Sequence, residues 1–211
     1  RSVILLLDEH GRNQHWREGG LAEQLAAQGR TVCAADIRGI GDLRPEVGRG
    51  APGYTIPHND EEEYAWASLI LGVPLLGQRV TDILALVQAF ASYGRIALVA
   101  NGRLTVPALF AAALDDRIHT AYLSSGLVSL RSVVTTENYK CPLANIAPSL
   151  LTHTDLPQLA EQMTPRKIYL AGCVDGTGRK MEIDAVKKLY PYPNVAVSKE
   201  QEWIAEKLSL L

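Results

Sequence analysis

Short apolar runs alternate with segments of helical periodicity along the whole chain, and this alternation limits the fold more than any other feature. The predicted strands are residues 2–7, 31–35, 96–100, 119–125, 167–171 and 195–198, and the predicted helices are 20–28, 61–71, 78–91, 104–114, 156–162, 184–190 and 200–210. Strands joined through helices in this way give right-handed crossovers and parallel pairing. We therefore predict an α/β fold, a three-layer α/β/α sandwich around a mainly parallel sheet of about six strands.

The length and charge of the chain exclude several classes of protein. Its 211 residues, 47% of them hydrophobic, are enough for one core, so we expect a single domain over residues 1–211. The 21 basic and 23 acidic side chains are interspersed, and the net charge of −2 leaves no basic face for nucleic acid. Apolar runs such as residues 3–7 are far shorter than the roughly 20 residues that cross a bilayer. We expect neither nucleic acid nor a membrane as a partner.

The three cysteines, Cys33, Cys141 and Cys173, lack the paired spacing of a redox or metal motif, and an odd number cannot pair completely. Cys33 and Cys173 lie in apolar runs typical of strands, where a buried free thiol is the simplest interpretation. The spacing leaves the roles of all three, and the compartment, open.

Polar and glycine residues follow the predicted strands in a characteristic order. The strand 31–35 runs into the pattern DxRGxG at residues 36–41, and His10 and Gly11 follow the first strand. At 96–114 a strand, a tight turn and a helix of small residues follow one another. This order resembles the α/β-hydrolase superfamily, and the stretches at 155–157 and 174–176 are similar to its acetylxylan-esterase-like members. The resemblance covers essentially the whole chain, although the first two strands of the family's fold have no counterpart in it.

The resemblance implies a nucleophile elbow at residues 100–104, where such esterases carry a serine in a GxSxG turn. Here Gly102 stands at the position of that serine. Asp175 fits the position of the catalytic acid, but it could equally be a turn aspartate that accepts backbone N–H groups. Residues 195–211, where the resemblance implies the catalytic histidine, contain none, and His153 is better explained as a loop or helix-cap histidine. Neither acyl transfer nor proton transfer then has an evident carrier.

The resemblance also implies an oxyanion site beside a crevice at the carboxyl ends of the strands. His10 and Gly11 lie in the loop that supplies oxyanion donors in the family, and Arg103 directly follows the elbow apex. Three further arginines of the adjoining loops could bind a sugar or a carboxylate, namely Arg12, Arg38 and Arg44. Alternatively, these arginines pair with aspartates of the same loops and only hold the fold together.

No cofactor and no metal site is predicted. The segment 39–41 begins like the dinucleotide fingerprint GxGxxG, but the sixth position is Arg44. The acidic cluster at 60–63, with His58, could suggest a metal site. Neighbouring side chains at a helix start point in different directions, however, and acids there suit the positive end of the helix dipole.

These observations predict a non-catalytic hydrolase-like domain, a structural or ligand-binding module of a larger esterase-like protein. The expected partner is a neighbouring domain or chain of the same protein, and the expected ligand is a carbohydrate or an ester. The alternative is an active carbohydrate (acetyl) esterase whose nucleophile or histidine comes from another chain or domain. The resemblance alone suggests a secreted or periplasmic location.

Overall fold

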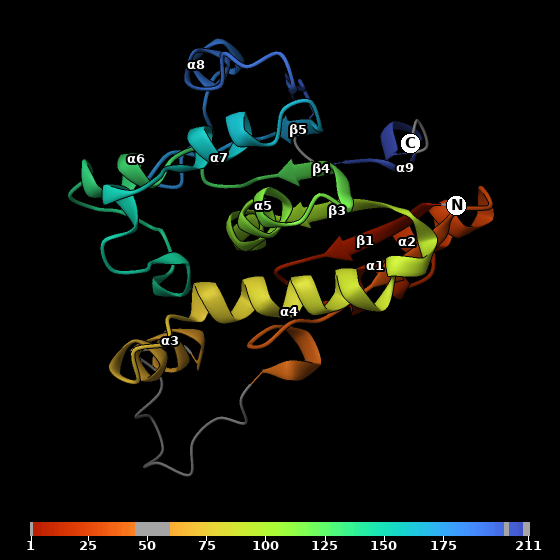
Figure 1. Cartoon of the computed structure of the whole chain (residues 1–211), viewed down its shortest axis with the longest axis horizontal. Coiled ribbons are helices and arrows are strands. Elements are labelled where there is room, and N and C mark those ends of the chain that lie inside the picture. The colour runs from red at the N-terminus through yellow and green to blue at the C-terminus, as the bar shows by residue number, and fades with distance from the viewer. Residues whose placement is uncertain (1, 45–59, 201–202, 209–211) are drawn as a thin grey trace.

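The computed structural model describes residues 2–44, 60–200 and 203–208 and shows a six-stranded sheet with helices on both faces (Figure 1). The strands are β1 (Ser2–Leu7), β2 (Thr31–Ala34), β3 (Arg95–Asn101), β4 (Ile118–Ser124), β5 (Lys167–Ala171) and β6 (Val195–Val197). Their order across the sheet is β2-β1-β3-β4-β5-β6, and every neighbouring pair is parallel. The predicted three-layer α/β/α fold is confirmed.

Alternate residues of strands β1 to β5 serve two hydrophobic cores, because successive side chains of a strand point to opposite faces of the sheet. Val3, Leu5 and Leu7 of β1 belong to the larger core, and Ile4 and Leu6 to the smaller one. The larger core is completed by α4 (Leu75–Ala89), α5 (Thr105–Leu114) and α7 (Leu156–Gln162), and the smaller one by α2 (Leu21–Ala27) and α9 (Ala205–Leu208). Burial on both faces explains why the strands are continuously apolar.

The other helices border these layers or connect them. They are α1 (Asn13–Trp16), α3 (Asp60–Ile70), α6 (Leu130–Val134) and α8 (Ile183–Leu189), with single 3₁₀ turns at η1 (Gly41–Leu43), η2 (Ala91–Tyr93), η3 (Gly102–Leu104), η4 (Leu143–Asn145) and η5 (Leu150–Thr152). Ala65 of α3, Leu75 of α4 and Ala144 of η4 form a small third cluster of buried residues. This cluster fixes α3 and η4 against the first turn of α4.

The strand order reverses between β1 and β3, so the loops that follow these two neighbouring strands lead to opposite faces of the sheet. Such a switch point is where open α/β sheets form their ligand crevice. The parallel register pairs Leu7 of β1 with Ala100 of β3. Two residues beyond this pair, Glu9 and Gly102 therefore come to face one another.

The observed elements differ from the predicted ones mainly at their ends. Helix α4 begins at Leu75, three residues before its predicted start, directly after Pro74. Helix α9 covers four residues of the predicted helix 200–210, of which residues 201–202 and 209–210 lie outside the described part of the chain. All three cysteines are free, but only Cys173 is fully buried.

No single helix among the described residues is both long and apolar enough to cross a membrane. Helices α3 and α4 reach the required length and composition only as a pair, and that pair is bent by 100°.

Candidate functional site

The elbow predicted from the sequence lies between β3 and α5. Gly102 is the first residue of η3, is buried, and has a φ of +60°, a conformation that favours glycine. The hydroxyl of Thr105 donates to the Gly102 carbonyl at 2.8 Å and closes the turn. Alanine and proline then give α5 a small cross-section against the sheet. Residues 96–114 therefore form the strand, tight turn and helix of small residues that the sequence predicts.

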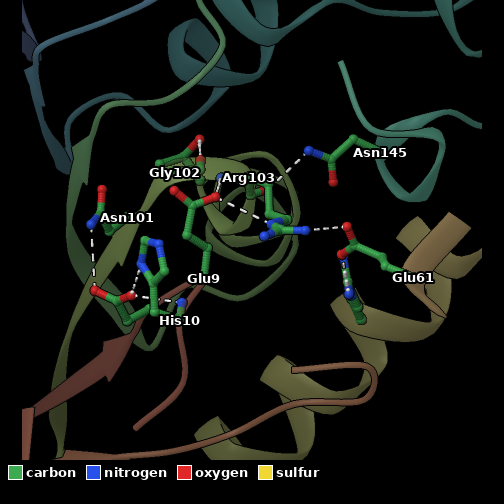
Figure 2. A network of polar contacts seen from close by, with 10 residues as sticks. Glu9, His10, Glu61, Asn101, Gly102, Arg103 and Asn145 are labelled. Atoms are coloured by element: carbon green, nitrogen blue, oxygen red, sulfur yellow. Dashed lines mark hydrogen bonds and ion pairs between the residues drawn. The ribbon is translucent and has the colours of Figure 1, made fainter. Parts of the chain in front are cut away.

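The carboxylate of Glu9 lies directly over the apex (Figure 2). A Cβ atom built on Gly102 would overlap all three atoms of that carboxyl group, far inside van der Waals contact. The backbone N–H of Arg103 donates to Glu9 Oε2 at 3.2 Å, and Arg103 Nε donates to the same oxygen at 3.2 Å. An acidic side chain of the same chain therefore fills the space over the apex and accepts the Arg103 backbone N–H.

Arg103 continues into a buried ion network. Its Nη1 donates to Glu61 Oε2 (Figure 2). On the other side of the same carboxylate, Arg79 Nη2 lies 2.6 Å from Glu61 Oε1. The Arg79 side chain is 0% exposed, and its Nε donates to the Arg38 carbonyl at 3.1 Å. Two guanidinium groups and the carboxylates of Glu9 and Glu61 thus balance in charge, with Arg79 and Glu61 buried and with Arg103 and Glu9 32% and 26% exposed.

The pKa shifts of the two arginines follow from this arrangement. Burial opposes the charge on Arg103, but Glu61 and Glu9 outweigh it and raise the pKa of Arg103. For Arg79 burial is the larger effect and lowers its pKa, although Glu61 acts in the opposite direction.

Asn145 of η4 adds a hydrogen bond from its Nδ2 to the Arg103 carbonyl at 2.9 Å. The network therefore ties α3, α4 and η4 to the elbow.

The predicted oxyanion donors of the loop after β1 are engaged by that loop's own aspartate. The backbone N–H of His10 donates to Asp8 Oδ1 at 2.8 Å, and the N–H of Gly11 donates to the Asp8 carbonyl at 2.9 Å. Burial opposes the charge on Asp8, but hydrogen bonds from His15 and the His10 backbone outweigh it and hold the pKa of Asp8 well below its usual value. Asn101 Nδ2, at 3.4 Å, links Asp8 to the end of β3.

The DxRGxG pattern holds the neighbouring loops together. Asp36 Oδ1 accepts the backbone N–H of Arg12 at 2.7 Å, and its Oδ2 accepts that of Asp42 at 3.0 Å. Gly41 has a positive φ of +56°, and a Cβ atom there would overlap the Asp36 carboxylate. The aspartate and the second glycine of the pattern, Asp36 and Gly41, therefore each have a structural explanation.

The three arginines predicted to bind ligand all contact their own chain. Arg12 Nη2 lies 2.8 Å from Asp42 Oδ2. Arg38 donates from Nε and Nη2 to the carboxylate of Asp82 at 2.7 and 2.5 Å. Arg44 Nε donates to the Gly41 carbonyl at 3.3 Å. Of the three, only Arg44 lines the same cavity as Glu9, His10 and Arg103.

Asp175 lines a second, smaller cavity together with Glu9, Gly102 and Arg103. Its Oδ1 accepts the backbone N–H and the hydroxyl of Thr177 at 2.8 and 2.6 Å, and the N–H of Arg179 at 3.0 Å. The hydrogen bond from the Thr177 hydroxyl is the main cause of the lowered pKa of Asp175. The structure thus places Asp175 beside the elbow while giving its carboxylate the contacts of a turn aspartate.

The other candidates lie apart from the elbow. His153 is exposed and follows the single turn η5. His58 lies outside the described residues, and in the part of the chain that is described no three acidic, histidine or cysteine side chains gather as a metal site. Glu61, expected as an acid that suits the positive end of the helix dipole, belongs to the ion network.

Glu9, Glu61 and Arg79 were not predicted as site residues. One signal for Arg79 is present in the sequence, because it lies four residues before Ile83 on the apolar face of α4. A charged side chain at such a position needs a buried partner. For Glu9 no comparable pattern exists, since its neighbours belong to a polar loop.

The parallel sheet, its crossovers and the sharp turn after β3 together define an α/β-hydrolase-like domain, and known structures agree. A putative acetyl xylan esterase from Bacteroides fragilis aligns with 99% of this chain and 59% of its own, at a TM-score of 0.67 and 18% identity. Acetyl xylan esterases from Paenibacillus and Thermoanaerobacterium align with 98% and 100% of this chain, and 71% and 72% of theirs, both at a TM-score of 0.58, with 17% and 16% identity.

The chain thus has the fold of acetyl xylan esterases and spans less than two thirds of the first of these proteins. No protein-family model matches it, and no curated protein matches it.

Proposed function

We propose that this chain is a non-catalytic esterase-like domain that serves as a structural or ligand-binding module of a larger esterase-like protein. The observation that carries this proposal is the position of Glu9 over Gly102. At the point where an esterase needs a nucleophile, the chain has no side chain and an acidic group fills the space.

The oxyanion donors support the same proposal. Stabilisation of an oxyanion needs backbone N–H groups that are preorganised and open to the reacting oxygen. The three candidates, His10, Gly11 and Arg103, donate to Asp8 or Glu9 instead. A negative carboxylate at this place would also repel the developing charge of a tetrahedral intermediate.

Two hydroxyl groups close to the elbow, those of Thr105 and Ser124, supply no substitute nucleophile. Thr105 donates its hydroxyl proton to the Gly102 carbonyl, and the Ser124 hydroxyl lies 3.4 Å from Asn101 Oδ1. No imidazole is paired with either hydroxyl among the contacts of the described residues. Activation of a hydroxyl needs such a base within hydrogen-bond reach.

The active-esterase alternative requires a movement of Glu9. A nucleophile or histidine from another chain could act only after the Glu9 carboxylate had left the Arg103 amide, because an ester carbonyl would need that donor. The space over Gly102 would also have to open. The non-catalytic proposal needs no such rearrangement.

Hydrolysis of 4-nitrophenyl acetate by the purified protein tests the proposal. We expect the release of 4-nitrophenol by the unmodified chain, and by a matched variant, Asp184→Ala, in which an exposed acid of α8 is removed, to equal that of a control without protein. The same low rate is expected for Glu9→Ala and Asp175→Ala. Saturable turnover above the control that disappears on replacement of Glu9 or Asp175 would show that the domain is an enzyme.

A further inference from the structure

The Glu9 carboxylate is held as a ligand would be. It accepts a backbone N–H and a guanidinium Nε–H, both from Arg103 and both at 3.2 Å. It also lies at the amino-terminal end of η3 and α5, where helix dipoles favour negative charge. Together these groups form a cradle for a planar, singly charged anion.

The cradle lies between two cavities. The smaller, of about 160 Å³, is lined by residues that include Gly102 and Lys140, and the larger, of about 510 Å³, by residues that include His10 and Arg44. Glu9 and Arg103 line both. The Glu9 side chain, 26% exposed, therefore separates two spaces that solvent reaches, and its removal opens the cradle to small solutes.

The local charge favours an anion in this place. With Glu9 present, two carboxylates balance the guanidinium groups of Arg79 and Arg103. Without it, Glu61 alone faces both guanidinium groups, and the buried network has an excess positive charge. Buried charges are strongly unfavourable without a partner, so the network favours replacement of the lost carboxylate.

We propose that the elbow is a binding site for small monocarboxylates, that Glu9 is its internal occupant, and that an external carboxylate binds by replacing Glu9. This inference rests on the proposed function, since a catalytic elbow would need the same space for an ester. Tethering keeps Glu9 at a high effective concentration. Binding to the unmodified chain is therefore at least ~10-fold weaker than binding to a chain without the Glu9 side chain.

Acetate is the probe, with chloride at equal ionic strength as the control. The amide signals of Gly102 and Arg103 are followed by NMR during titration of the unmodified chain, Glu9→Ala and Glu9→Gln. For Glu9→Ala we expect saturable shifts with a dissociation constant on the order of 10 mM, as suits a ligand of few atoms. Glu9→Gln, whose amide still fills the cradle, should show no saturation in the same range, and chloride should not reproduce the shifts.

A folded Glu9→Ala chain whose Arg103 amide does not respond to acetate would overturn the proposal, as would an equal response to chloride. If Glu9→Ala does not fold in chloride buffer, the proposal predicts that acetate restores folding, and failure of both anions would contradict it. Failure here leaves the ester-hydrolysis result untouched. Conversely, ester turnover by the unmodified chain would overturn the proposed function whatever the acetate titration shows.

Discussion

The Glu9 carboxyl group and any side chain at position 102 exclude one another, because both would occupy the same space above the elbow. Gly102→Ala should therefore cost about 1–3 kcal/mol of unfolding free energy, part of it from the positive φ. In a Glu9→Ala background the overlap is gone, and we expect the same substitution to cost at least ~1 kcal/mol less. Urea denaturation of the four chains measures this coupling.

Gly29 provides the control for the backbone contribution. It has a φ of +77°, and no atom lies within 4 Å of a Cβ built on it. Gly29→Ala should cost only about 1 kcal/mol and should be insensitive to Glu9. Equal costs of Gly102→Ala in both backgrounds would mean that Glu9 does not fill the elbow.

The free energy of unfolding should depend strongly on Glu61, which bridges the two arginines of the ion network. Glu61→Gln leaves the guanidinium groups of Arg79 and Arg103 without their shared carboxylate, and we expect a loss of about 3–5 kcal/mol in unfolding free energy. Glu63→Gln, in the same turn of α3, should change stability by less than ~0.5 kcal/mol. Similar losses for the two substitutions, measured by chemical denaturation, would show that Glu61 is not the bridging acid.

The lowered pKa of Asp8 predicts a decline in stability at acid pH. Its pKa is lowered by folding, so its contribution is fully present above the unfolded value of about 3.9 and is lost as pH falls further, through the lower folded value. Asp8→Asn should therefore cost about 2 kcal/mol at pH 7, and the difference between the two chains should shrink below about pH 4. A difference that stays constant from pH 7 down to pH 2 would contradict this assignment.

Asp175 should behave as a turn residue. Asp175→Ala removes the acceptor of the Thr177 and Arg179 hydrogen bonds and should cost about 1 kcal/mol, whereas Asp175→Asn keeps an acceptor and should cost less. Thermal or urea unfolding distinguishes the two variants. A large change in ester hydrolysis with no change in stability would instead favour the catalytic-acid interpretation.

The sheet and the elbow could be predicted from the sequence because they depend on local patterns. Continuous apolar runs such as residues 3–7 mark strands buried on both faces, and the spacing of Val80, Ile83 and Val87 marks the face of α4 that packs on them. Gly102 could be placed at the apex because a tight turn between a strand and a helix of small residues has few alternatives.

The occupant of the elbow could not be predicted in the same way. Glu9 reaches Gly102 only because β1 and β3 are adjacent and pair Leu7 with Ala100. The sequences of the two loops do not determine the strand order or the register of the sheet. The Glu61 bridge similarly depends on how α3 packs against α4 and η4. The roles of Glu9 and Glu61 depend on long-range contacts that leave no pattern in the sequence around them. Arg79 differs, because a charged residue on the apolar face of α4 can be recognised from the sequence.

The most direct test of the account is a pH titration followed by NMR. The proton shift of the Arg103 backbone amide is compared with the shift of the Glu9 carboxyl carbon. If the Arg103 N–H donates to Glu9, its proton shift should follow the protonation of Glu9 with the same midpoint and should lose that transition in Glu9→Gln. An Arg103 amide that does not respond while the Glu9 carboxyl titrates would show that the carboxylate is elsewhere and that the elbow is open.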